Sequence, residues 1–216
     1  MSATRQPRRA GYSLIELLIS VGLLGLVFAA AGLVSRTSQG VYRQSSQASA
    51  LEARARQTLD RVVDLLATMV RSLAFPDPAV PAWTETLDFQ QAAGVVGGVL
   101  QPGPPLRLLL EMDDGEVRDG ADNDGDGLSD ESRLVLLRDP DTADERRTVL
   151  CRGIRDLAER EVANGADDNG NAMADERGFC LQRQDDVLRV LLTLEELGEG
   201  GRPVVRSVTT SFRIRN

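Results

Sequence analysis

Histidine and lysine are absent from this chain of 216 residues, and cysteine and aromatic residues are scarce. Without histidine there is no Ser-His-Asp triad, no Cys-His pair and no histidine-ligated zinc or haem. Two cysteines are too few for a four-thiolate metal site. All 25 basic residues are arginine, and 33 acidic residues bring the formal net charge to −8, which argues against nucleic-acid binding. These absences favour a structural or binding protein over an enzyme, with one domain and an extension.

The longest apolar stretch covers residues 12–34, in which Glu16 is the one charged residue. About 20 apolar residues cross a bilayer as a helix, so the length predicts a single transmembrane segment. Arg5, Arg8 and Arg9 precede it without any acid, which places the N-terminus in the cytoplasm and the rest of the chain across the membrane. A cleaved secretory signal peptide is the alternative, but its apolar core is shorter, about 7–15 residues, and ends in a small-residue cleavage site.

The residues around the start of this segment carry a family resemblance. Residues 8–20, Arg-Arg-Ala-Gly-Tyr-Ser-Leu-Ile-Glu-Leu-Leu-Ile-Ser, resemble the N-terminus of type IV prepilins and of the pseudopilins of type II secretion systems. The resemblance implies that a prepilin peptidase cuts between Gly11 and Tyr12 and that Tyr12, where the family usually has Phe, is N-methylated. It makes Glu16 the fifth residue of the mature chain. It also implies a non-enzymatic fibre subunit, anchored in the inner membrane with its head in the periplasm.

Glu16 is the residue that such a subunit would use in assembly. An isolated carboxylate at membrane depth costs about 2.5–3.5 kcal/mol, so it needs a partner or access to headgroup water. The resemblance implies that the partner is the N-terminal amine of a neighbouring subunit, because pairing offsets the burial of both charges and sets the register of the fibre. Contact with headgroup water near the start of the helix is the plainer alternative.

A second apolar pattern, at three-and-four spacing, predicts that the helix continues beyond the membrane with one buried face. Phe75-Pro76-Asp77-Pro78 is expected to end it, because proline cannot continue the helix. A coiled-coil stalk is an alternative, whereas the resemblance favours packing on the protein's own sheet. The buried face would hold Leu59, Val62, Val63, Leu66, Met69, Val70 and Leu73. The expected divisions are a leader (1–11), a transmembrane segment (12–34), the rest of the long helix (35–75), a connecting segment (76–105) and a β-rich periplasmic head (106–216).

The head is expected to be an antiparallel sheet. Alternating or β-branched apolar residues predict four strands, and two shorter segments are further candidates. Together with the long helix they predict an α+β fold, which is also the architecture that the resemblance implies. The strands are expected at residues 106–112, 133–138, 187–195 and 204–215, with the shorter candidates at 148–151 and 179–182.

Two acidic loops, residues 119–131 and 164–176, form an internal repeat with an offset of 45 residues. The first contains Asp-x-Asp-x-Asp-Gly, a pattern that supplies Ca²⁺ with carboxylate oxygens and a backbone carbonyl on a tightly turning chain. An EF-hand would have an acid at loop position twelve, where this chain has Arg133, so a shorter calcium loop is predicted. Its expected ligands are Asp122, Asp124, Asp126, the carbonyl of Leu128, and Asp130 or Glu131.

The second loop is predicted to be a weaker calcium site because asparagine replaces two acids and Ala172 replaces a glycine. Solvent-exposed turns without an ion are the alternative for both loops, since Asp, Asn and Gly favour turns for backbone reasons alone. The candidate ligands of the second loop are Asp167, Asn169, Asn171, Asp175 and Glu176.

Cys151 and Cys180 flank the second loop. In the oxidising periplasm they could form a disulfide, and two buried thiols are the alternative.

The residues and the resemblance together predict a minor pilin or pseudopilin, such as a J-type pseudopilin, with a calcium-stabilised head. Its partners would be prepilin peptidase, other pilin or pseudopilin subunits and the inner membrane, with no nucleic acid. A signal-anchored periplasmic calcium-binding or adhesion module that does not polymerise is the alternative from another class. An anchored hydrolase is disfavoured, since no nucleophile and base pair stands out.

Overall fold

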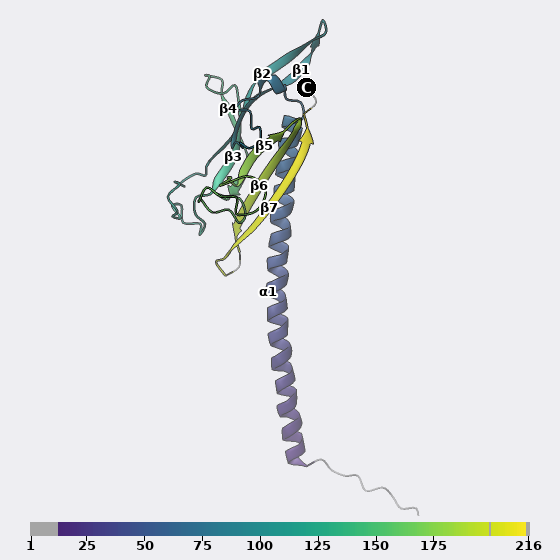
Figure 1. Cartoon of the computed structure of the whole chain (residues 1–216). Coiled ribbons are helices and arrows are strands. Elements are labelled where there is room, and N and C mark those ends of the chain that lie inside the picture. Colours follow the sequence, from purple (N-terminus) through teal and green to yellow (C-terminus); the bar gives the residue numbers. More distant parts are fainter. Residues whose placement is uncertain (1–12, 199, 215–216) are drawn as a thin grey trace, which may run out of the picture. The chain divides into compact units, whose positions relative to one another are not determined.

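The computed structural model describes residues 13–198 and 200–214, and the chain divides into two compact units, Met1–Ser45 and Ser46–Asn216. The elements of the described residues are one long helix, a short 3₁₀ helix and seven strands, and Figure 1 labels the long helix and the strands. They are α1 (Leu14–Leu66), η1 (Arg71–Leu73), β1 (Thr86–Val96), β2 (Val99–Met112), β3 (Ser132–Arg138), β4 (Arg146–Ile154), β5 (Phe179–Gln184), β6 (Val187–Leu197) and β7 (Pro203–Arg213).

In the first unit, the described chain is the first part of α1, which begins with its apolar segment. The segment Leu14–Leu33 has a mean hydropathy of 2.4 and is long and apolar enough to cross a membrane. Its side chains are exposed, including those of its leucine and isoleucine residues. This confirms the predicted long apolar N-terminal helix.

Helix α1 ends at Leu66, earlier than the sequence predicted. The chain that follows pairs with β1: the N–H of Val70 donates to the carbonyl of Gln90, and the N–H of Ala92 donates to the carbonyl of Thr68, both at 2.8 Å. The side-chain amide of Gln91 donates to the carbonyl of Leu65, also at 2.8 Å, and so satisfies one of the last helical acceptors. The helix therefore stops because its next residues find strand partners, well before the prolines.

All seven strands belong to one antiparallel sheet. Strands β1, β2, β3 and β4 follow one another in order, and β4 meets β6 where Ile154 lies opposite Leu194. Strand β6 is also paired with β5 on the same edge as β4, and with β7 along its other edge. The four strands expected from the sequence and both shorter candidates are confirmed.

The segment 76–105 is more than the connection that the sequence suggested. Most of it forms β1 and the first half of β2, a hairpin that extends beyond the predicted strand at 106–112. Apolar and polar residues do not alternate regularly along this hairpin. Pro102, Pro104 and Pro105 cannot donate hydrogen bonds to the neighbouring strand, and the pairing shifts register near Ala92. Strand β1 is at the edge of the sheet, and the first half of β2 pairs with β1 alone, because the pairing of β2 with β3 begins at Leu106, so prolines are tolerated there.

The main core lies between one face of the sheet and the last turns of α1, which run alongside β6 and β7 in Figure 1. The helix side chains in this core begin further upstream than the sequence suggested, and Leu73 is 43% exposed and lies outside α1. The strands contribute Leu87, Phe89, Leu108, Ile154 and Leu192 among others, and α1 contributes Leu51, Ala55, Leu59, Val62 and Leu66. This packing confirms the predicted α+β fold.

Replacing Val62 with alanine should destabilise this core. Val62 is fully buried, whereas the neighbouring Val63 is half-buried. Loss of two buried methyl groups should lower the free energy of unfolding by about 1.5 kcal/mol for Val62→Ala. Val63→Ala, the same change one residue further along α1, should cost less than half as much in urea unfolding of the detergent-solubilised chain. Equal costs would contradict the helix face described here.

Candidate functional site

Glu16 lies in the first turn of the apolar helix. The N–H groups of Glu16 and Leu17 donate to the carbonyl of Ser13 at 3.0 and 3.1 Å, which starts the helix at this point. One turn later the Ser20 hydroxyl donates to the Glu16 carbonyl at 2.8 Å. The predicted cleavage site, Gly11 and Tyr12, lies outside the described residues.

The first acidic loop, between β2 and β3, folds around the carboxylate of Asp122. One oxygen of Asp122 accepts the N–H of Gly125 at 2.6 Å and the other accepts the N–H of Gly127 at 3.0 Å. Both glycines have a positive φ, of 85° and 94°, which side chains rarely adopt. The tight turn expected from the Asp-x-Asp-x-Asp-Gly pattern is therefore present.

Two further aspartates of the pattern each bind the backbone two residues ahead. Oδ1 of Asp124 accepts the N–H of Asp126 at 3.0 Å, and Oδ1 of Asp126 accepts the N–H of Leu128 at 2.9 Å. These turns fix the orientation of both carboxylates, and the side chains themselves are exposed. The second oxygen of each is the one that a cation could use.

Glu116, which the sequence analysis missed, organises the loop from outside the pattern. Its buried carboxylate accepts three backbone N–H groups, from Asn123 at 2.9 Å, Asp124 at 3.0 Å and Asp130 at 2.9 Å. Single oxygens of Glu116, Asp122 and Asp124 lie within 4.8 Å of one another, an arrangement that could hold a metal ion. The 45-residue repeat contained the signal, because extending it upstream aligns Glu116 with Glu161.

Asp130 and Glu131, the two candidates for the last calcium ligand of the first loop, differ in their surroundings. The carboxylate of Asp130 closes the loop by accepting the N–H groups of Asp119 and Gly120 at 2.9 and 3.0 Å. Glu131 is only 4% exposed, and its Oε1 finds no hydrogen-bond partner among the described residues. Burial, with the nearby charges of Asp126 and other acids, raises the pKa of Glu131 to about 7. A buried carboxylate oxygen beside further acids fits a bound cation, which would supply the missing partner.

The second acidic loop, between β4 and β5, repeats this backbone framework. Glu161 accepts the N–H groups of Asp168 and Asn169 at 3.1 and 2.9 Å, as Glu116 does in the first loop. Asp167 takes the place of Asp122 and accepts the N–H of Ala172 at 2.8 Å. Backbone N–H groups that donate to Asp167, that of Ala172 above all, hold the pKa of Asp167 below its ordinary value.

At the centre of the second loop, amide groups replace carboxylates. The NH₂ groups of Asn169 and Asn171 both donate to Oε1 of Glu176, the former at 2.7 Å. Glu176 is completely buried, and it lies at the position that Glu131 has in the first loop. The remaining predicted ligand, Asp175, instead closes the loop by accepting the N–H groups of Asn164 and Gly165, both at 2.8 Å.

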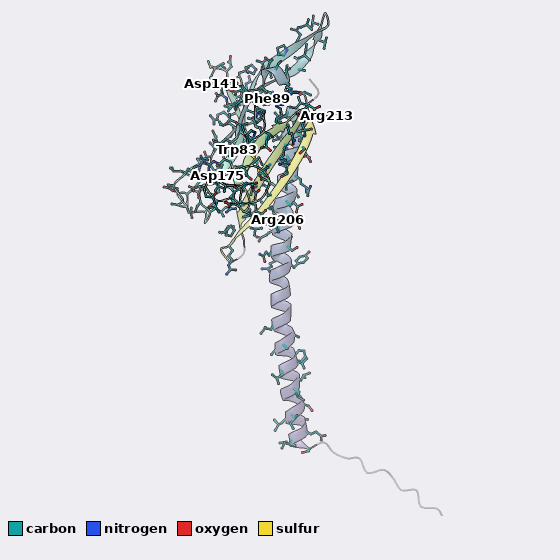
Figure 2. The ribbon with its side chains drawn as sticks, in the orientation of Figure 1. Trp83, Phe89, Asp141, Asp175, Arg206 and Arg213 are labelled. Atoms are coloured by element: carbon teal, nitrogen blue, oxygen red, sulfur yellow. The ribbon has the colours of Figure 1, made fainter. Side chains whose placement is uncertain are left out.

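The second loop also covers the sheet face opposite α1. Met173 packs there in a small buried cluster with Ala158, Cys180 and Leu191. The indole N–H of Trp83 donates to the carbonyl of Ala174 at 3.1 Å, and Figure 2 labels Trp83 close to Asp175. The loop is thus part of the folded head.

The disulfide considered from the sequence is not formed, because both cysteines are free and buried. Cys151 belongs to the core beneath α1, whereas Cys180 belongs to the cluster on the other face of the sheet. The Sγ atom of Cys180 lies 3.9 Å from Sδ of Met173. The alternative of two buried thiols therefore describes this structure.

The N-terminal part of the chain is similar to a known family. A family model described as the prokaryotic N-terminal methylation motif matches residues 6–32. Neither a curated protein nor a solved structure matches the chain. The matched range includes Gly11, Tyr12, Glu16 and most of the apolar segment.

The chain therefore carries a prepilin-type start, followed by a helix packed on an antiparallel sheet. These features give the described chain a pilin-like α+β architecture behind a prepilin-type N-terminus. The motif indicates processing by prepilin peptidase and anchoring in the inner membrane through the apolar helix.

Proposed function

We propose that this protein is a minor pilin or pseudopilin, such as a J-type pseudopilin or a similar minor pilin. It is built into a type II secretion pseudopilus or a type IV pilus after cleavage between Gly11 and Tyr12 and methylation of Tyr12. The observation that carries the proposal is the methylation motif at residues 6–32, which overlaps an apolar helix whose described residues Leu14–Leu33 contain Glu16 as their single charge. The helix-on-sheet head supports it.

The proposal includes one Ca²⁺ in the first acidic loop. The unpartnered oxygen of Glu131 supports this, together with Asp122, Asp124 and Asp126, whose carboxylates are already oriented by backbone bonds. Six to eight oxygens suit Ca²⁺, and the carbonyl of Leu128 and water would complete the set. The ion would join the loop between β2 and β3 to the rest of the head.

The acidic loops also support a second candidate, a membrane-anchored periplasmic calcium-binding or adhesion module that does not polymerise. This candidate shares the head and the apolar helix with the first. It differs in that processing at Gly11 and a role of Glu16 in assembly would be absent.

The two candidates are separated by expressing the full chain with and without a prepilin peptidase and determining the intact mass and N-terminal sequence. The expected product with the peptidase lacks residues 1–11 and carries one added methyl group on Tyr12. Gly11→Val should retain the leader under the same conditions, because the residue before the cut is changed. A wild-type chain that stays unprocessed would reject the fibre-subunit proposal and favour the anchored module.

A further inference from the structure

From the two acidic loops we infer that the second is a metal-independent copy of the first, in which the amide groups of Asn169 and Asn171 take the place of the cation. This inference rests on the calcium site proposed for the first loop. It assigns different roles to two loops whose sequences predict the same one. The first loop needs an ion to balance the charge at its centre, and in the second loop the side-chain amides take that part.

The two loops have the same backbone framework. The side chains at their centres, which are the four matched ligand positions of each loop, can therefore be compared directly. In each, a buried glutamate three residues before the loop accepts backbone N–H groups from the middle and from near the end of the loop. In each, an aspartate near the end accepts the N–H groups of the first two loop residues. Ala172 even keeps a left-handed conformation, with φ of 69°, at the position of Gly127. The framework has therefore been retained where the residue type disfavours it.

The centres differ in charge. Four matched positions hold four carboxylates in the first loop and two carboxylates with two amides in the second. They are Asp122, Asp124, Asp126 and Glu131 in the first loop, and Asp167, Asn169, Asn171 and Glu176 in the second. Because the affinity of a calcium loop rises with the charge of its ligands, the second centre is the poorer site.

The orientation of the two asparagines makes the amide groups donors toward the centre. Oδ1 of Asn169 accepts the N–H of Asn171 at 3.1 Å, and Oδ1 of Asn171 accepts the N–H of Met173 at 2.8 Å. With each side-chain oxygen turned to the backbone, each NH₂ group points to Oε1 of Glu176. Hydrogen bonds from two donors thus stabilise a buried carboxylate that a cation would otherwise have to neutralise.

Carboxylates cannot do the same in the first loop. Asp124 and Asp126 make the equivalent backbone bonds, but their second oxygens are acceptors and cannot donate to Glu131. Oε1 of Glu131 accordingly finds no partner within residues 13–198 and 200–214, whereas Oε1 of Glu176 accepts from two amides and only Oε2 of Glu176 is left without a partner there. The two loops therefore differ in the donors at the buried glutamate: two side-chain amides bind Glu176, and the aspartates at the same positions can offer Glu131 none without a cation.

A permanently closed second loop fits its position. Met173 fills the buried cluster on the sheet face opposite α1, so opening of this loop would expose Cys180 and Leu191. The guanidinium of Arg189 also donates to the carbonyl of Asn171 at 3.2 Å, which adds a positive charge beside the loop. Leu128, at the matching position of the first loop, is buried as well at 9% exposed, but it belongs to neither of the two hydrophobic clusters of the described residues.

Calcium stoichiometry tests the inference. The full chain in detergent micelles is titrated with Ca²⁺ by calorimetry, with bound metal counted by mass spectrometry. We expect one ion per wild-type chain, two for Asn169→Asp/Asn171→Asp, and none for Asp124→Asn/Asp126→Asn. Asn164→Asp adds a carboxylate to the second loop away from Glu176 and should leave the count at one. A reading of two ions in the wild type, or no gain in the double aspartate variant, would overturn the inference.

Hydrogen exchange of the wild-type chain gives a test that needs no variant. On chelation of calcium, backbone amides in residues 119–131 should lose protection at least tenfold, while those in 164–176 should keep it. Equal loss in both loops would overturn the inference and leave the calcium proposal intact. A wild-type chain that binds no ion would instead reject calcium in the first loop. The amide closure would then still be supported by a gain of one ion in Asn169→Asp/Asn171→Asp.

Discussion

Glu16→Ala is expected to remove the protein from the fibre while leaving its synthesis, membrane insertion and processing unchanged. On the proposed function, the Glu16 carboxylate meets the N-terminal amine of a neighbouring subunit in an apolar environment. Removing one member of a buried ion pair costs about 3–5 kcal/mol, because the other charge is left without a partner. Since 1.4 kcal/mol corresponds to about a factor of ten, incorporation should fall on the order of 100-fold or more. The protein in sheared fibres is measured against the protein in membranes.

Alanine is a strong helix former, so the change should not disturb the helix itself. Ser20→Ala is the matched control, because Ser20 lies one turn further along α1 and its hydroxyl bonds only the Glu16 carbonyl in the described part of the chain. It should assemble as the wild type does. Normal incorporation of the Glu16→Ala protein would contradict the fibre-subunit proposal, even if cleavage at Gly11 were observed.

Removal of calcium is expected to destabilise the head and to open the first acidic loop before any other part of it. At calcium 100-fold above the dissociation constant, a bound ion adds about 2.7 kcal/mol to the free energy of unfolding, which chelation would remove. Trypsin cleavage after Arg118, which is exposed beside the loop, should then become about 100-fold faster. Digestion of the full chain in detergent, with calcium, with magnesium and with a chelator, measures this effect. Magnesium should not protect, because it demands a smaller octahedral set of ligands.

Glu131→Gln gives the sharper test of the same site. Above pH 7, where Glu131 is ionised, the variant replaces a buried charge with a neutral amide, so it should be more stable than the wild type in chelator and less stable in calcium. Asp144→Asn, at an exposed position outside both loops, should show the wild-type response. If the order of the two stabilities did not reverse between chelator and calcium, Glu131 would not be a ligand.

The sequence predicted those parts of the fold that depend on simple periodicity. The apolar run from Leu14, the strands with regular alternation and the antiparallel class are all present in the structure. The hairpin of β1 and β2 was missed because Pro102, Pro104 and Pro105 read as a connection, although an edge of a sheet can accommodate them. The end of α1 at Leu66 was missed because it depends on pairing with Gln90 and Ala92, which lie more than twenty residues away in the chain.

Within the site, the pattern identified the Asp-rich loops but not their long-range supports. Glu116 precedes the Asp-x-Asp-x-Asp-Gly run and becomes relevant only when the loop folds back on its carboxylate. The asparagines of the second loop looked like weak ligands, and whether their amides present an oxygen or an NH₂ group depends on backbone bonds that the sequence does not show. The separation of Cys151 from Cys180 likewise depends on which face of the sheet each residue occupies.

The position of β6 in the sheet determines when the head can fold during synthesis. This strand pairs with β4, β5 and β7, yet it is the next-to-last strand to be made. The apolar stripe of α1 emerges from the ribosome first and packs against side chains of β6, so it has to wait for almost the whole chain. Because such distant contacts form slowly, a chain interrupted before Val187 would expose the helix stripe, the open edge of the β1–β4 group and strand β5, whose partner β6 would be missing. Quality control that removes unfinished chains would therefore matter more for this protein than for one whose early segments fold by themselves.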